Sequence, residues 1–206
     1  MILCDIGNTH FSFYRSGRIW KEPIKKPTIT DINEQILFIS VNPKGTQKLK
    51  LHRPDAIDIS SFLRLDTIYR GLGVDRIAVC MAIEEGVIID AGSAITVDVM
   101  QNSIHLGGYI LPGLNAFRKC YADISPVLDV NLNPNININS LPQSTEEAVS
   151  YGVIKSTILT LQNSIKTKHI YFTGGDGKFF AKFFDDAIFD ESLVFKGMIK
   201  ALENIR

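Results

Sequence analysis

One pattern occurs twice in the chain. A short apolar run leads into Asp-x-Gly and a polar residue, and an apolar-alternating segment follows. The first copy is MILCDIGNTHFSFY at residues 1–14, and the second is VIIDAGSAITVDV at residues 87–99. Each copy predicts a buried strand, a tight turn and a second strand. Two copies favour a duplicated fold whose two turns face one cleft, although two ordinary hairpins would give the same pattern.

Strands and helices mix along the rest of the chain. Apolar runs predict further strands and a second hairpin, at residues 35–41, 56–59, 170–172 and 94–111. Helical spacing and end signals predict four helices, at residues 74–82, from Pro112-Gly113 onward, from the Ser144/Glu147 capping box to Ile165, and at 193–202. The mixture predicts an α/β or α+β protein.

Composition narrows the classes of function. The chain has 206 residues, 45% of them hydrophobic, and a formal net charge of zero. Without a long basic run, attraction to nucleic acid or to an anionic membrane is not expected. No apolar stretch approaches the roughly 20 residues of a membrane span, and no secretion leader is recognisable. We therefore expect a cytoplasmic protein whose cysteines, Cys4, Cys80 and Cys120, are reduced and serve as small core residues.

The two Asp-x-Gly turns combine residue types that bind phosphate and metal. Glycine leaves backbone N–H groups open to a ligand, and such groups cradle phosphate oxygens. Gly7–Thr9 would supply these donors in the first turn, and Gly92 with Ser93 would do so in the second. Phosphates normally arrive with Mg²⁺, which prefers carboxylates and water. Asp5 and Asp90 are therefore interpreted as the carboxylates that face a cation.

Five motifs occur in an order that resembles a known family. They are DIGNT (5–9), GVDR (73–76), DAGSAITVD (90–98), GGYILPG (107–113) and TGGD (173–176). The set resembles the type III pantothenate kinases, coenzyme A pathway enzymes of the actin-like, sugar-kinase-like ATPase superfamily. Many actin-like ATPases carry something close to the first motif. Gly-x-Asp-Arg shortly before the second Asp-x-Gly, with Gly-Gly-x-Ile-x-Pro-Gly after it, is more specific.

The resemblance implies a fold and an activity. The fold is a duplicated actin-like, ribonuclease H-like α/β ATPase fold with two domains flanking a nucleotide cleft. The expected domains are residues 1–72 and 73–206, and the C-terminal helix can pack back on the first. The activity is ATP-dependent phosphorylation of pantothenate to 4′-phosphopantothenate, the first step of coenzyme A biosynthesis. The implied assembly is a homodimer with shared substrate pockets.

The resemblance also implies a role for each matching residue. The first ATP-phosphate loop corresponds to Asp5, Ile6, Gly7, Asn8, Thr9, His10, Phe11 and Ser12, and Ser93 matches a second ATP contact. The pantothenate motif corresponds to Gly73, Val74, Asp75 and Arg76, with Asp75 as general base. Tyr69 and Thr145 match further pantothenate contacts, Thr145 from the partner subunit. Asp90 matches the ligand of a monovalent cation, potassium or ammonium, and Asp5 would hold Mg²⁺ through water.

The chain differs from the family pattern in places. Ser93 replaces the usual Thr and keeps its hydroxyl, whereas Ile95 interrupts a Thr-rich run. Tyr69 lies four residues before Gly73, closer than in many members. The chain is also short for the family.

The residues by themselves allow other interpretations. Asp75 could be a carboxylate that only favours a helix N-terminus, and Arg76 could be a surface cation. Thr145 could serve as a local helix cap. Asp98 could end a strand in solvent and is not placed in the catalytic set. The histidines, His10, His52, His105 and His169, lack metal-ligand spacing and are interpreted as structural or exposed.

Two other functions stay open at this point. One is a kinase of another small hydroxyl acceptor on the same fold, because fold alone does not determine the acceptor. The other is a non-catalytic regulatory homologue of the family.

Overall fold

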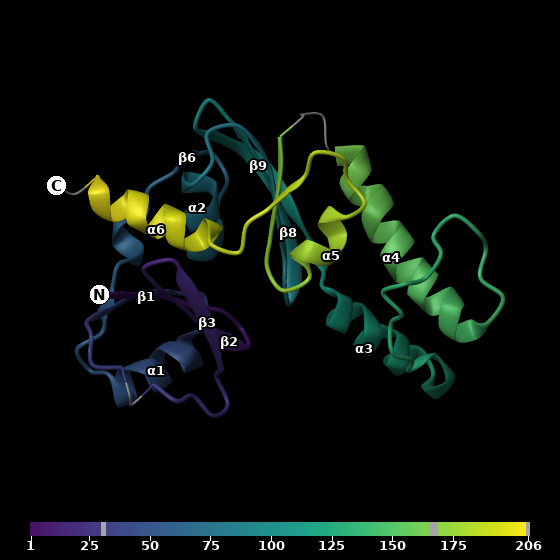
Figure 1. The fold of residues 1–206 in the computed structure, drawn as a ribbon, viewed down its shortest axis with the longest axis horizontal. Coiled ribbons are helices and arrows are strands. Elements are labelled where there is room, and N and C mark those ends of the chain that lie inside the picture. The colour runs from purple at the N-terminus through teal and green to yellow at the C-terminus, as the bar shows by residue number, and fades with distance from the viewer. Residues whose placement is uncertain (30–31, 165–168, 205–206) are drawn as a thin grey trace. The chain divides into compact units, whose positions relative to one another are not determined.

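The computed structural model describes residues 1–29, 32–164 and 169–204 (Figure 1). Its strands are β1 (Ile2–Ile6), β2 (His10–Arg15), β3 (Arg18–Pro23), β4 (Ile36–Ser40), β5 (Ile57–Asp58), β6 (Asp66–Thr67), β7 (Gly86–Ala91), β8 (Ala94–Gln101), β9 (Ile104–Pro112), β10 (Ile170–Thr173) and β11 (Ile188–Phe189). Its α-helices are α1 (Pro43–His52), α2 (Val74–Met81), α3 (Leu114–Ile124), α4 (Thr145–Ser164), α5 (Gly177–Ala181) and α6 (Leu193–Glu203), and 3₁₀ turns lie at Ser60–Phe62 and Pro126–Leu128.

The strands form two sheets with the same internal order. The first sheet runs β3-β2-β1-β4-β5, and the second contains β9-β8-β7-β10-β11 with β6 added beside β9. In each sheet the strand that ends in Asp-x-Gly lies at the centre, and its neighbour β4 or β10 is parallel to it. A helix, α1 or α5, then connects that neighbour to the next parallel strand. The duplicated α/β fold is therefore confirmed, and the alternative of two ordinary hairpins is wrong.

Contacts along the chain divide it into two compact units. The first unit contains Met1–Glu85, Asp98–Gly107 and Glu191–Arg206, and the second contains Gly86–Val97 and Gly108–Asp190. The hairpin β8–β9 thus contributes its turn end to the first unit and its other end to the second. The boundary expected after residue 72 separates the two copies of the duplicated fold and not these two units, so it stays a prediction.

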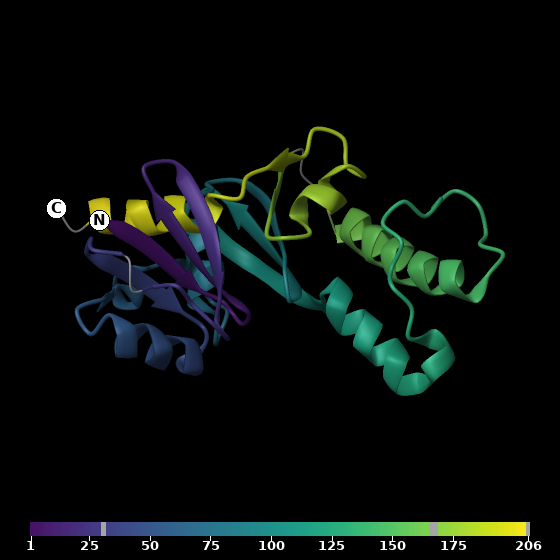
Figure 2. The same ribbon diagram turned by 60° about the horizontal axis from the view of Figure 1, so that its bottom comes forward.

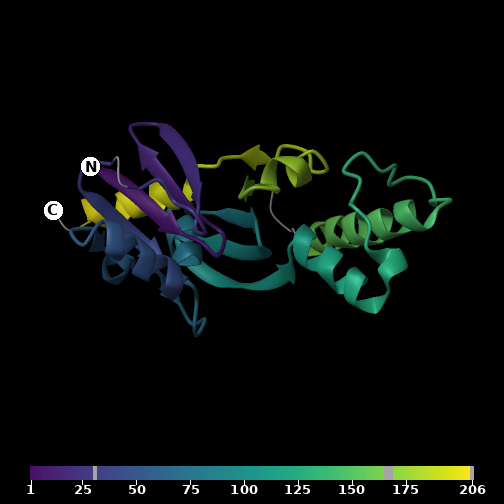
Figure 3. The same cartoon turned by 90° about the horizontal axis from the view of Figure 1, so that it is seen from below.

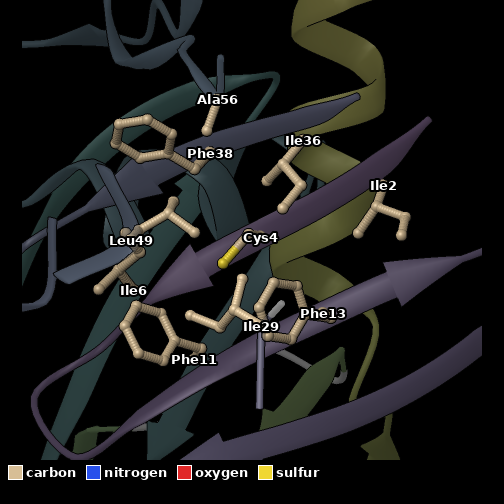
Figure 4. Packing of buried hydrophobic residues seen from close by; sticks show 10 residues of the cluster. All are labelled: Ile2, Cys4, Ile6, Phe11, Phe13, Ile29, Ile36, Phe38, Leu49 and Ala56. Carbon is tan, nitrogen blue, oxygen red and sulfur yellow. The ribbon is translucent and has the colours of Figure 1, made fainter. Parts of the chain in front are cut away.

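Successive side chains of β1 pack into two different hydrophobic cores of the first unit. Cys4 and Ile6 point into one core, where Figure 4 shows them gathered with Phe11, Phe38 and Leu49 of α1. Leu3 points to the opposite face and packs in a core that α2 and α6 supply. Successive side chains of a strand point to opposite faces, so Asp5 lies on the face of Leu3, the one covered by α2.

Helix α6 packs closely against α2 on that second face. The two helices lie side by side in Figure 1, and Figure 2 shows α6 running along β1. Phe195 and Met198 of α6 are buried there with Ala78 of α2. A Cβ atom on Gly197 would lie 1.7 Å from the backbone oxygen of Ala78, so only glycine allows this approach.

The long helix α4 belongs to the second unit, where it contacts α3 (Figure 3). Ser144 caps it as the sequence predicts, because its Oγ accepts the N–H of Glu147 at 3.2 Å. Of the expected apolar stripe, the members Ile154, Ile158 and Leu161 are buried, and Tyr151 is half-buried. Ile165 lies outside the described residues.

Several elements of the structure were not predicted from the sequence. Helix α1 is one of them, because only Gly45 and Leu49 of its residues are buried and its apolar periodicity is weak. The short elements α5, β6 and β11 are also absent from the prediction. Cys4 and Cys80 are core residues as predicted, but Cys120 is exposed on α3, so that expectation is wrong.

Gly197→Ala should destabilise the protein although alanine favours helix. The added methyl group would have to displace the backbone of Ala78, and we expect a loss of about 2–3 kcal/mol in the free energy of unfolding. The measurement is denaturant unfolding of purified protein. Gly175→Ala is the matched control, because a Cβ there meets open space among the described residues. Equal stability of the two variants would contradict the close packing of α6 on α2.

Candidate active site

The first Asp-x-Gly turn is braced by the residue that begins helix α1. The N–H of Gly7 donates to the backbone oxygen of His10 at 3.1 Å and closes the turn. The Nδ2 atom of Asn42 donates to the backbone oxygens of Gly7 and Asn8 at 3.2 and 3.3 Å. Its Oδ1 accepts the N–H of Gly45 at 3.1 Å and thereby caps α1. The helix cap and the turn are thus held by one side chain.

The predicted ATP-loop residues fall into two groups. Asn8, Thr9 and His10 are exposed at the turn. Ile6 and Phe11 are fully buried in the core, so only their backbone atoms can reach a ligand. Ser12 is half-buried on β2 opposite Asp5.

Asp5 itself lies at the carboxyl end of β1. It is half-buried, and its Oδ1 atom is shielded from solvent. Strand β4 is parallel to β1, so the carboxyl ends of the two strands share an edge, and ligands of open α/β sheets bind at such edges. The segment after β4 also approaches the motif at residues 73–76, since Val41 lies beside Gly73.

The Gly73–Arg76 motif forms the start of helix α2. Gly73 is the N-cap, and Asp75 lies in the first turn. The carboxylate of Asp75 accepts the N–H of Arg76 at 2.8 Å. A Cβ atom on Gly73 would lie 2.5 Å from Oδ1 of Asp75, so glycine makes room for this carboxylate.

The environment of Asp75 favours proton uptake. Burial raises the pKa of its carboxyl above the ordinary value, although the backbone hydrogen bond from Arg76 works in the opposite direction. A carboxylate with a raised pKa is a stronger base than a free aspartate. Its position at the opening of α2 is therefore suited to accepting a proton from a hydroxyl.

Arg76 belongs to a buried polar network. Its Nε and Nη2 atoms donate to both carboxylate oxygens of Asp98, at 2.9 and 2.7 Å. The Nε2 atom of His105 lies 2.8 Å from Oδ1 of Asp98. Arg76 is 6% exposed, His105 2% and Asp98 0%. The interpretations of Arg76 as a surface cation and of Asp98 as a solvated strand end are therefore wrong, whereas His105 is structural as expected.

The same network contains a geometric candidate for a metal site. The ligand atoms of Cys80, Asp98 and His105 lie within 4.8 Å of one another. The guanidinium of Arg76 already occupies both oxygens of Asp98 and supplies the positive charge there. We assign these residues to an ion-pair network and not to a metal centre.

The second Asp-x-Gly turn lies in the second unit and is packed by two other glycine motifs. The N–H of Gly92 donates to the backbone oxygen of Ala94 at 2.9 Å, and Ser93 is exposed. Gly174 has a φ of +84°, and a Cβ atom there would lie 2.3 Å from Oδ1 of Asp90. A Cβ atom on Gly113 would lie 2.3 Å from the backbone oxygen of Gly92. Three sequence motifs, DAGS, PG and TGGD, therefore meet at this turn.

A pocket of about 310 Å³ lies in the second unit beside the TGGD motif. Its lining combines apolar and polar side chains, among them Leu114, Asn115, Arg118, Asp176 and Phe179. Burial raises the pKa of the Asp176 carboxyl. The N–H of Asp176 donates to the backbone oxygen of Ala91 at 2.9 Å and ties the pocket to the second turn.

The remaining predicted residues take two different positions. Tyr69 lies in the first unit, with its ring centre 5.0 Å from the guanidinium carbon of Arg76. Thr145 begins α4 in the second unit and is exposed. Because Ser144 provides the cap of α4, the Thr145 hydroxyl is not needed for that purpose.

Sequence reasoning missed two parts of this arrangement. Asn42 is followed by proline, an N-cap signal that would have indicated the start of α1. Asp98 ends the DAGSAITVD motif, but an aspartate or a histidine on a strand can equally well be exposed, so the sequence does not indicate that Asp98 and His105 form a buried network.

The duplicated strand order and the two glycine turns define an actin-like, sugar-kinase-like ATPase fold. A Sinorhizobium meliloti structure provisionally named a 2-dehydro-3-deoxygalactonokinase matches it with a TM-score of 0.63, over 99% of this chain and 96% of that chain, at 8% identity. The family model for type III pantothenate kinase matches residues 48–167. The Helicobacter hepaticus type III pantothenate kinase is 55% identical over 98% of both chains. The chain therefore belongs to the type III pantothenate kinase family.

A second solved structure is similar over the whole chain. It comes from Campylobacter jejuni, is provisionally named a Baf family transcriptional activator, and is 42% identical with a TM-score of 0.86. The match covers 100% of this chain and 98% of the Campylobacter jejuni chain.

Proposed function

We propose that the protein transfers the γ-phosphoryl group of ATP to the primary hydroxyl of pantothenate, giving 4′-phosphopantothenate and ADP in the first step of coenzyme A biosynthesis. The observation that carries the proposal is the Gly73–Arg76 motif. It places a half-buried carboxylate, Asp75, at the first turn of α2 and raises its pKa by burial. Family membership supplies the substrate class.

Asp75 is the proposed general base. It accepts the proton of the pantothenate hydroxyl while that oxygen forms its bond to the γ-phosphorus and the bond to the ADP oxygen breaks. Positioning and charge neutralisation provide most of the catalysis in phosphoryl transfer. Gly73 contributes by leaving space for the carboxylate beside the helix N-terminus.

ATP would be held mainly by backbone groups. The exposed turn at Asn8–His10 and the exposed Ser93 present the donors that phosphate oxygens require. The pocket lined by Asn115 and Asp176 suits a nucleoside, because it offers polar groups for ribose next to apolar side chains for a base.

Two cations are part of the proposal. Mg²⁺ bound with ATP would neutralise phosphate charge, and the Asp5 carboxylate at the end of β1 fits this hard cation through a bridging water. Asp90 is the proposed ligand of potassium or ammonium. Its Oδ1 lies close to Gly174, and the backbone oxygen of Ala91 lies close to the same glycine, so carbonyl oxygens could join the carboxylate as cation ligands.

The pantothenate pocket would combine residues of two subunits. Tyr69 and Arg76 come from one chain, and Thr145 would come from its partner in a homodimer. Exposed apolar side chains of the second unit, such as Ile124, Val127 and Leu159, support an association between copies. We place the enzyme in the cytoplasm, and no helix among the described residues is long and apolar enough to cross a membrane.

The choice of acceptor is tested directly by product analysis. With pantothenate, ATP and Mg²⁺, purified protein should release ADP. It should also yield a product about 80 mass units heavier than pantothenate, the mass that transfer of a phosphoryl group adds as HPO₃. Sugars and polyols at the same concentration should give only background ADP. Faster turnover of another acceptor would replace the substrate, and no turnover with any acceptor would favour the regulatory alternative.

Asp75→Asn should lower kcat by about 10²–10⁴-fold, because the amide cannot accept the proton. The wild type should lose kcat/KM as the pH falls, in a range above the ordinary aspartate pKa, since the base must be deprotonated. The variant should lack this acid limb. Thermal melting is the control for folding. Turnover within a few-fold of wild type, with the acid limb unchanged, would remove Asp75 from this role.

Activity should depend on a monovalent cation in addition to Mg²⁺. A cation at Asp90 would shield the negative charge gathered between ATP and pantothenate. Rates measured in sodium and in potassium or ammonium at constant ionic strength should differ, and Asp90→Asn should reduce the difference. Equal wild-type rates in all three salts would count against the assignment.

Shared pockets can be tested by complementation. Asp75→Asn and Thr145→Arg chains should each be inactive, and subunit exchange should restore one intact site in each mixed dimer. Random exchange of a two-fold symmetric dimer predicts about one quarter of the wild-type rate. A mixture that stays inactive after exchange has been verified by mass spectrometry would contradict sites built from two chains.

A further inference from the structure

Arg76 does not present a free positive charge to a substrate. Asp98 accepts from Nε and Nη2 of the guanidinium, which fixes the guanidinium plane and neutralises its charge. The remaining donors are those on Nη1 and one hydrogen of Nη2. The Nη1 atom lies 3.5 Å from the Tyr69 hydroxyl, on the side where the guanidinium meets the Tyr69 ring.

The network continues from Asp98 to the backbone of Tyr69. His105 contacts Asp98 through Nε2, and its Nδ1 lies 2.7 Å from Oγ1 of Thr67. Pairing of β6 with β9 places Thr67 opposite His105. The same Oγ1 accepts the N–H of Tyr69 at 3.0 Å. A neutral His105 with its hydrogen on Nε2 satisfies every bond in this series.

Two independent connections therefore hold Tyr69 and Arg76 together. One is the stack of the ring on the guanidinium, and the other runs through Thr67, His105 and Asp98. Both connections reach Arg76, which follows the proposed base Asp75 directly and donates its backbone N–H to the Asp75 carboxylate.

We propose that Asp98 and His105 are positioning residues of the pantothenate pocket, which hold Arg76 and Tyr69 in the arrangement that receives the substrate beside Asp75. The inference rests on the proposed function. It assigns a role to two buried residues that the phosphate turns and the Gly73–Arg76 motif do not include. Buried polar networks of this kind lose geometry when one partner is removed, because the others are left without their hydrogen bonds.

The test separates positioning from general stability by comparing the two substrates. Asp98→Asn should lower kcat/KM for pantothenate by about 10- to 100-fold through misplacement of Arg76, while the KM for ATP stays within about twofold. His105→Ala should show the same pattern. His105→Gln should lose less, because its amide can still donate to Asp98. The exposed residues Asp185 and His52 provide matched controls, as Asp185→Asn and His52→Gln.

The outcomes distinguish the inference from the function on which it rests. A wild type that does not phosphorylate pantothenate overturns the proposed function itself. An active wild type, with folded variants that keep their KM for pantothenate or lose affinity for both substrates equally, overturns the positioning role. If Asp98→Asn does not fold, the two His105 variants decide, and equal kinetics of Ala and Gln there would contradict the inference.

Discussion

Helix α2 packs against α6 through a contact that is too close for any residue but glycine. Gly197 of α6 lies against the backbone of Ala78, and the apolar side chains around it bury one face of both helices. This packing holds α2 in place against α6, and Asp75 lies in the first turn of α2, directly after its N-cap region. Because the pleat of β1 turns Asp5 toward the face that α2 covers, the same constraint places both carboxylates on one side of the sheet.

Charge in this region is arranged in pairs. Arg76 is paired with Asp98, and the Asp98 charge raises the pKa of Asp75 while the Arg76 charge lowers it. Burial can then dominate and raise the pKa of Asp75. If the Arg76 guanidinium paired with Asp75 instead of Asp98, its charge would lower that pKa further and weaken the base. The buried ion pair thus explains how a motif that places Asp next to Arg can still provide a base.

Much of this arrangement was predictable from the sequence, and the exceptions have physical reasons. The repeated Asp-x-Gly pattern predicts the duplication, since period-two strands and glycine turns are local properties of the chain. Helix α1 was not predictable from periodicity because few of its side chains are buried. The network around Asp98 was not predictable at all, because pairing β6 with β9 brings Thr67 and His105 together across 38 residues of sequence.

The proposed mechanism depends on the placement of the pantothenate hydroxyl at Asp75. A crystal structure of the protein with pantothenate and a non-hydrolysable ATP analogue measures this directly. If Asp75 is the base, the primary hydroxyl lies within about 2.6–3.2 Å of an Asp75 oxygen, on the side facing the γ-phosphate. Pantothenate bound with that hydroxyl away from Asp75, and in contact with another group, would show that Asp75 is not the base.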